Sequence, residues 1–401
     1  MSRIDREMFN FTATPPLSLY IHIPWCVSKC PYCDFNSHEV RKDIPEERYI
    51  EALIADLEQD LPAVWGRTVE SLFIGGGTPS LFSARGIARL LSEVRSRIPL
   101  KPGAEITLEA NPGTVDQTHF SGFREAGINR LSMGVQSFQD GLLAAIGRIH
   151  GGSEARIAVE SARRAGFENI NLDLMFGLPA QTTAQALLDL HTAVDLQPAH
   201  ISFYELTIEP NTRFFRHPPR RPDDDILWEM QTAGRSLLDS AGYQRYEVSA
   251  YAQPGRQCRH NLNYWQFGDY LGIGAGAHAK ISNAATQTIT RTSKVKHPRA
   301  YLDATGSDAR IGSHNELSVD DVILEFAMNS LRLDSGFTRS SFTAATSLPY
   351  AVIETRVHTA IEHQLMTDDN NIIKVTEKGQ RYLNGLLQHW MPELPQHAET
   401  R

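Results

Sequence analysis

The sequence predicts an α/β fold built on a parallel sheet, because strand-like and helix-like segments alternate from residue 17 to residue 206. Apolar residues recur at spacings of three and four in the helix-like segments, whereas the strand-like segments are short apolar runs. Repeated β-α units have right-handed crossovers and form either an open doubly wound sheet or a curved partial barrel. We expect strands at 17–24, 69–75, 105–110, 130–135, 169–176 and 200–206, and helices at 47–61, 84–98, 153–165 and 184–196.

Polar and glycine-rich residues follow or end each expected strand in turn. In parallel α/β sheets, ligands bind at the carboxyl ends of the strands. In strand order, these ends carry a cysteine loop, Gly75-Gly76-Gly77-Thr78-Pro79, Glu109-Ala110-Asn111-Pro112, Gln136-Ser137-Phe138, Asp173, and Tyr204 with Glu205. The sequence therefore predicts one site at one rim of the sheet.

The loop after the first strand contains Cys26, Cys30 and Cys33 in the spacing C-x3-C-x2-C. Three thiolates on a four-iron cubane leave one iron open to a small molecule. Zinc is the alternative, with His22, His38 or Cys258 as fourth ligand, although a second C-x2-C or H-x3-H pair is absent from the sequence. Three cysteines in one short loop, out of four in 401 residues, do not suit a disulfide framework.

Composition indicates a large globular protein, with 41% hydrophobic and 21% charged residues. The longest apolar run falls well short of the eighteen residues that a membrane-spanning helix needs, although attachment to a membrane surface stays open. The net charge of −8 argues against general nucleic-acid binding. Residues 1–16 are polar and contain no apolar signal segment, so we expect an N-terminal tail and a cytoplasmic location.

The glycine run at 75–77 lets a ligand approach the backbone, whose amides and carbonyls can serve a zwitterionic head group. A run of this kind can also be no more than a tight turn. It matches neither the G-x4-G-K-[ST] phosphate loop nor the G-x-G-x2-G dinucleotide fingerprint.

These motifs resemble the radical S-adenosylmethionine superfamily, whose cysteine motif is similar to 26–33 and whose methionine-amine loop is similar to 75–79. Segments 20–24, 109–112 and 134–138, with Arg148, resemble the branch that contains oxygen-independent coproporphyrinogen III dehydrogenase. Within that branch, His260-Asn261-Leu262-Asn263-Tyr264-Trp265 is similar to the H-N-x2-Y-W signature of HemW-like haem chaperones. The resemblance implies a partial (β/α)6 barrel of the radical S-adenosylmethionine type.

The resemblance also implies a 4Fe-4S cluster on Cys26, Cys30 and Cys33, with S-adenosylmethionine chelating the fourth iron. One electron from the cluster would then cleave a C–S bond of the sulfonium. Taken singly, Arg148 or Glu109 could equally form an ordinary salt bridge. The implied cofactor contacts are Tyr32 near the adenine; Gly76, Gly77 and Thr78 at the methionine end; Arg148 at its carboxylate; Gln136 and Asp173 at the ribose; and Glu109 with Tyr20 at the rim.

His260 lies in an aromatic stretch, and an imidazole in such surroundings can ligate haem iron. The alternative is a hydrogen-bonded histidine in a lid or domain seam. Cys258 could assist haem binding as a thiolate. Phe35 stands where the dehydrogenase pattern has a fourth cysteine, which argues against dehydrogenase activity.

The C-terminal region is expected to resemble a winged helix, with helices at 319–331 and 351–364, a hairpin at 365–375 and a helix at 377–390. From His314 to Arg401 there are twelve acidic and seven basic residues, so we favour a lid or docking module over DNA binding. The expected domains are the tail 1–16, the barrel 17–245, a connecting segment 246–300 with the HNLNYW motif, and the winged-helix-like domain 301–401.

The sequence therefore predicts a chaperone that binds haem, a 4Fe-4S cluster and S-adenosylmethionine, and delivers haem to an acceptor such as a respiratory haem protein. The alternatives are an oxygen-independent coproporphyrinogen III dehydrogenase and a metal-binding winged-helix regulator.

Overall fold

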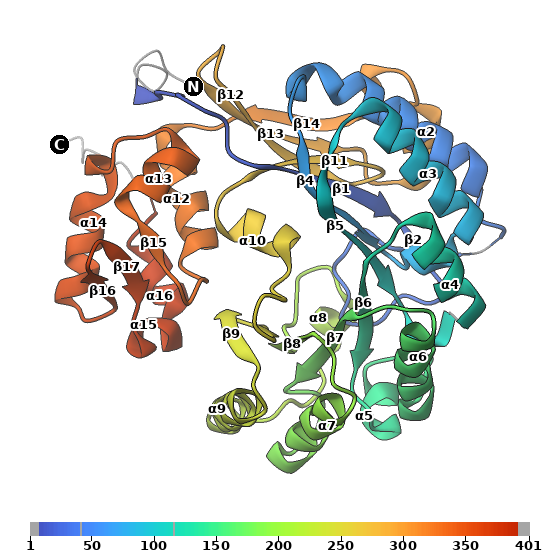
Figure 1. Ribbon diagram of the computed structural model, residues 1–401. Coiled ribbons are helices and arrows are strands. Elements are labelled where there is room, and N and C mark those ends of the chain that lie inside the picture. The colour runs from blue at the N-terminus through green and yellow to red at the C-terminus, as the bar shows by residue number, and fades with distance from the viewer. Residues whose placement is uncertain (1–7, 41, 115–116, 392–401) are drawn as a thin grey trace, which may run out of the picture.

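The computed structural model describes residues 8–40, 42–114 and 117–391, and a mixed sheet of twelve strands forms its centre (Figure 1). Six strands run parallel as neighbours in chain order, which confirms the predicted fold class. They are β1 (Leu17–Ile23), β4 (Val69–Gly76), β5 (Leu100–Ala110), β6 (Arg130–Gln136), β7 (Asn169–Phe176) and β8 (His200–Glu205).

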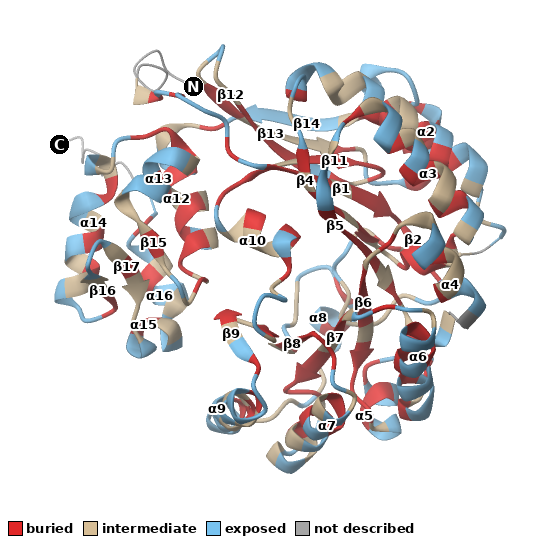
Figure 2. Cartoon of the chain, in the orientation of Figure 1, coloured by how far each residue is buried: buried red, intermediate tan, exposed pale blue. Residues whose placement is uncertain are grey.

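Helices cover the outer side of the curved sheet (Figure 1). Figure 2 shows the central strands mostly buried and the helices buried along one side only, as amphipathic crossovers require. The helix patterns at 47–61, 84–98, 153–165 and 184–196 each match a helix to within about a residue, whereas α4 (Gln117–Ala126) and α9 (Asp224–Ser240) were not expected. The helices are α2 (Glu46–Asp60), α3 (Ala84–Arg97), α4 (Gln117–Ala126), α5 (Asp140–Ala145), α6 (Gly152–Arg164), α7 (Thr183–Asp195), α8 (Arg213–Arg216) and α9 (Asp224–Ser240).

The sheet continues past residue 245, at which the predicted barrel ends. On one side, β10 (Ala250–Ala252) pairs antiparallel with β8, and β9 (Gln244–Glu247) pairs antiparallel with β10. On the other side, β11 (Asp269–Ile273) pairs parallel with β1. The added elements are β9 (Gln244–Glu247), β10 (Ala250–Ala252), α10 (Arg259–Trp265), β11 (Asp269–Ile273), β12 (His278–Asn283), β13 (Thr288–Lys294), α11 (Pro298–Asp303) and β14 (Ile311–Glu316).

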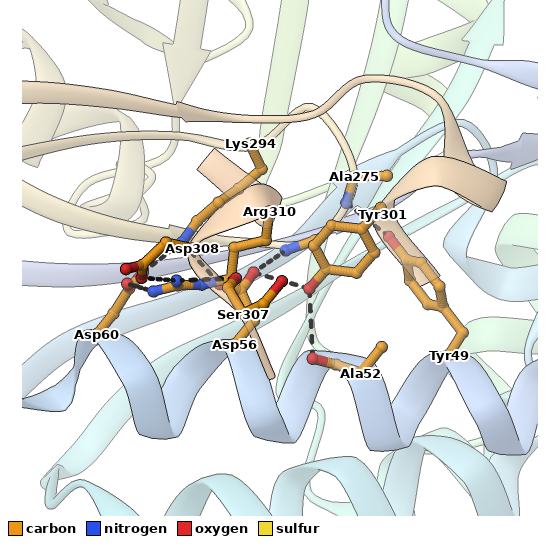
Figure 3. A network of polar contacts seen from close by, with 11 residues as sticks. Tyr49, Ala52, Asp56, Asp60, Ala275, Lys294, Tyr301, Ser307, Asp308 and Arg310 are labelled. Carbon is orange, nitrogen blue, oxygen red and sulfur yellow. Dashed lines mark hydrogen bonds and ion pairs between the residues drawn. The ribbon is translucent and has the colours of Figure 1, made fainter. Parts of the chain in front are cut away.

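A buried polar network anchors this extension to α2 (Figure 3). The Asp56 carboxylate accepts hydrogen bonds from Lys294 Nζ at 2.6 Å and Arg310 Nε at 2.9 Å. It also accepts from Gly274 N at 3.0 Å and Tyr301 Oη at 2.7 Å. Because Asp56 and Lys294 are each 1% exposed, both charges depend on these partners.

The C-terminal region is winged-helix-like, with a core of its own that Phe9 and Phe11 of the N-terminal segment join. The expected helix at 377–390 is two helices, because the backbone leaves helical geometry at Tyr382. Residues 1–7 of the predicted tail and 392–401 of the predicted domain lie outside the described residues. The elements are α12 (Val319–Ser330), β15 (Phe337–Thr338), α13 (Arg339–Thr346), α14 (Ala351–Glu362), β16 (Met366–Asp369), β17 (Ile372–Val375), α15 (Glu377–Arg381) and α16 (Leu383–Gln388).

Ion pairs join the C-terminal region to the barrel. Arg245 forms a two-pronged pair with Asp334, both contacts at 2.8 Å. Arg332 pairs with Glu247 at 3.0 Å and stacks over the ring of Trp265 at 4.5 Å.

Across the three described ranges, no helix combines the length and apolar character needed to cross a bilayer.

Candidate functional site

A cavity of about 380 Å³ opens at the carboxyl ends of the parallel strands. The strand ends therefore converge on one site, as the sequence analysis expected. Of the predicted site residues, all but Tyr20 and His260 line it: Cys26, Cys30, Tyr32, Cys33, Gly76, Gly77, Thr78, Glu109, Gln136, Arg148 and Asp173.

The cysteine loop is held in shape by its own hydrogen bonds. Short parallel strands β2 (Trp25–Cys26) and β3 (His38–Glu39) close its two ends. Lys29 Nζ donates to the carbonyls of Phe35 at 3.1 Å and Ser37 at 3.2 Å. These contacts hold the loop with its three cysteines lining the cavity.

The three thiols suit a polynuclear cluster. Burial raises the pKa of Cys26 and Cys33, so both are protonated thiols until a metal displaces the proton. Within the described parts of the chain, no three His, Cys, Asp or Glu side chains are grouped closely enough to hold one metal ion. The cysteines of a four-iron cluster bind different iron atoms and need not converge on one point.

The glycine loop packs against the base of the cysteine loop. A Cβ on Gly77 would lie 2.5 Å from the Trp25 carbonyl oxygen, and Gly76 has a φ of +125°. The amides of residues 76–78 all donate within the protein, to Glu109 Oε2, Ile23 O and Trp25 O at 2.7–3.0 Å. These three amides are therefore engaged within the protein, and contact of Gly76, Gly77 and Thr78 with a methionine end stays a prediction.

Glu109 is a titratable group at the centre of the site. Burial and the nearby Asp173 carboxylate raise its pKa to about 8, against the opposing effects of the Gly76 amide and Arg130. Glu109 can therefore gain or lose a proton near neutral pH, depending on the charge of what binds beside it.

Arg148 connects the polar rim to the cluster loop. Its Nη1 lies 3.7 Å from Cys30 Sγ, and its Nη2 donates to Asn111 Oδ1 at 3.0 Å and to the Gly134 carbonyl. Its buried Nε has no partner among the described residues. A guanidinium with a spare donor at this place suits a carboxylate ligand.

The two residues expected at the ribose are held by hydrogen bonds from side chains of β6, β7 and β8. Gln136, with a φ of +69°, accepts a hydrogen bond from Tyr204 Oη at 2.7 Å. Asp173 accepts from Ser132 Oγ at 3.1 Å and Asn171 Nδ2 at 2.8 Å.

Several residues that line the cavity were not predicted, although they follow a simple pattern in the sequence. On β6, β7 and β8, polar residues recur at every second position, which places them on one face of strands that are otherwise apolar. The missed residues on these strands are Arg130, Ser132, Asn171 and Ser202, and the connecting segment adds Glu247, Ser249, Asn261 and Trp265.

His260 lies outside this cavity, with an exposed fraction of 1%. Its Nδ1 is bonded to Ser71 Oγ and its Nε2 to Tyr264 Oη, both at 3.1 Å. Burial and the Arg130 charge lower its pKa to about 3. Both ring nitrogens are occupied, so iron ligation by His260 would require Ser71 or Tyr264 to move away.

Cys258 is buried and does not line the cavity. Its thiol donates to Glu105 Oε1 at 3.5 Å, and burial raises its pKa to about 12. The surroundings of Cys258 thus favour the protonated thiol over a thiolate ligand.

A curved parallel sheet with three loop cysteines facing a polar cavity at its carboxyl rim defines the radical S-adenosylmethionine class. The Radical SAM superfamily profile matches residues 20–191, and the HemN C-terminal domain profile matches residues 317–382. Coproporphyrinogen III oxidase (HemN) from Escherichia coli, a solved structure, shares the fold with a TM-score of 0.80 and 24% identity, covering 95% of this chain and 91% of that chain.

The chain is 50% identical to the heme chaperone HemW of Haemophilus influenzae, over 94% of this chain and 99% of the relative. It is 48% identical to heme chaperone HemW of Escherichia coli K12, with the same coverage. The chain belongs to the HemW family of heme chaperones.

Proposed function

We propose that the protein binds haem and delivers it to an acceptor protein, and that it also carries a 4Fe-4S cluster and S-adenosylmethionine. The observation that carries the proposal is the match, at half identity over nearly the whole chain, to proteins named heme chaperones. The cysteine-lined cavity supports the cofactor part. We also propose a cytoplasmic location, because reduced cysteines need a reducing compartment.

The chemistry of the cavity fits the two cofactors. Arg148 Nε, Arg130 Nε and Trp265 Nε1 are buried donors without a partner in the described residues, and all three side chains line the cavity. Because orphaned buried donors are rare, these three are suited to acceptor oxygens or nitrogens of a ligand. A bound cluster would supply one electron to the sulfonium, while Arg148 holds the carboxylate and Glu109 faces the cationic end.

A haem-transfer experiment tests the proposal. The anaerobically purified protein is loaded with one equivalent of haemin and mixed with apomyoglobin, and the absorption spectrum is followed. We expect a Soret band on loading and its conversion to the myoglobin spectrum on mixing. Failure to bind haemin at micromolar concentrations would contradict the proposal.

The pKa of Glu109 predicts how S-adenosylmethionine affinity depends on pH. Below about pH 8 the free carboxyl is protonated, and a cationic ligand must first displace that proton. We expect affinity to rise by up to ~10-fold per pH unit up to about pH 8 and then level off. Calorimetric titrations from pH 6 to 9 measure it. In Glu109→Gln the slope should disappear, and an unchanged slope in that variant would assign it to another group.

Coproporphyrinogen III turnover separates the proposal from the dehydrogenase alternative. Phe35 is 66% exposed where that pattern has a cysteine, so we expect no vinyl product from reduced protein with S-adenosylmethionine. Chromatography of the porphyrins after the reaction measures this, and product formed over many turnovers would favour the enzyme.

A further inference from the structure

A second cavity, of about 530 Å³, adjoins the first. Gly76 and Glu109 line both cavities, so the two share a wall. Its size is within the range of pockets that bury most of a small-molecule ligand, which is roughly 300–1,000 Å³. None of the three cysteines lines it, so a ligand here would be distinct from the cluster.

Three tyrosines from different elements line this second cavity: Tyr20 of β1, Tyr264 of α10 and Tyr270 of β11. Tyr264 and Tyr270 meet edge to face, with ring centroids 4.4 Å apart. Arg291 donates to the Tyr270 hydroxyl and pairs with Glu325 of α12 at 2.5 Å. The rings are therefore held in place, and fixed aromatic rings favour a flat conjugated ligand.

His278 also lines the second cavity and has a free imidazole. Its side chain is exposed, and in the part of the chain that the structure describes no hydrogen bond involves its ring. The neighbouring His22 has both nitrogens occupied, Nδ1 with Tyr20 Oη at 3.0 Å and Nε2 with Asn36 O at 2.9 Å. Both nitrogens of His260 are occupied too. Of these three histidines, only His278 offers a ligand without breaking a hydrogen bond.

The backbone of His278 is fixed although its ring is free. A Cβ on Gly272 would lie 1.9 Å from the His278 carbonyl oxygen, so only glycine lets β12 start this close to β11. The turn between these strands is held by Asp56, which accepts from Gly274 N, and by Tyr49, whose hydroxyl accepts from Ala275 N at 2.9 Å (Figure 3). The buried network of α2 thus sets where His278 stands.

We propose that the second cavity is the haem site, with the His278 imidazole as an axial ligand of the iron and the Lys296 ammonium beside a propionate. Haem has a flat conjugated ring, an iron that takes an axial imidazole and two anionic propionates. The tyrosines, His278 and the exposed Lys296, which also lines the cavity, match these three features. This assignment rests on the proposed haem-binding function and gives it a place in the molecule.

Haemin titration of the full-length protein tests the assignment, comparing His278→Ala with His314→Ala. His314 is an exposed histidine on β14 of the same sheet and does not line the second cavity, so it is a matched control. In His278→Ala we expect haemin affinity to fall by ~10-fold or more and the Soret band to shift. In His314→Ala we expect neither to change. Free imidazole at millimolar concentration should restore the Soret position in His278→Ala, which a merely structural role would not allow.

Two results would overturn the assignment. In the first, His278→Ala binds haemin with the affinity and spectrum of the unchanged protein. In the second, His260→Ala loses the Soret band while its circular dichroism and cluster content stay unchanged, which would make His260 the ligand. If the unchanged protein takes up no haemin, the proposed function itself fails, and this outcome is distinct from both.

Discussion

Replacing Cys33 with alanine is expected to abolish the iron-sulfur cluster. The anaerobically reconstituted protein should hold about four iron and four sulfide per chain, whereas Cys33→Ala should hold almost none. A cubane on two protein thiolates has two open irons, and the rigid loop offers no substitute sulfur. Iron and acid-labile sulfide assays, with the visible absorption of the cluster, measure the loss.

Cys258→Ala is the matched control, since it removes the remaining cysteine of the four in the sequence. Its thiol is buried, bonded to Glu105 and outside the cavity, so cluster content should stay unchanged. Equal loss of cluster in Cys258→Ala would show that the assignment of three loop ligands and one open iron is wrong.

Asp56→Ala is expected to cause a large loss of stability. The change leaves the buried Lys294 and Arg310 with Asp60 as their shared carboxylate. Removing one member of a buried ionic network costs about 3–5 kcal/mol of unfolding free energy. Urea unfolding followed by circular dichroism measures it.

Arg48→Ala tests the same helix at its surface. Arg48 pairs with Asp303, and both side chains are about 60% exposed, so the expected loss is about 0–1 kcal/mol. Similar losses in Arg48→Ala and Asp56→Ala would show that the network adds no more than a surface pair.

We also expect weaker haemin binding in Asp56→Ala, because the network holds the turn before His278.

The six parallel strands could be predicted from sequence because apolar residues recur at every second position on at least one face of each strand. Their carboxyl ends then located the cavity, and the C-x3-C-x2-C loop identified its chemistry. The extension through β11 to β14 could not be predicted, since whether a late segment pairs with the open edge of β1 depends on tertiary structure. The antiparallel strands β12 and β13 are largely polar and carry little strand signal.

The hydrogen-bond partners of His260 could likewise not be predicted from the sequence. The aromatic stretch suggested an imidazole facing a ligand, but Ser71 of β4 and Tyr264 occupy both nitrogens. The Ser71 contact spans 189 positions and could not be inferred from local pattern. Conversely, His278 stood beside a glycine run that reads as a packed turn, and only the fold shows that its ring lines a cavity.

Joint analysis of iron, sulfide and haem on one anaerobic sample tests whether cluster and haem occupy separate, adjoining cavities. After saturation with haemin and gel filtration, we expect about four sulfide, one haem and five iron per chain. Haemin uptake that expels sulfide and iron in proportion would mean that the two groups compete for one site, and would rule out separate cavities.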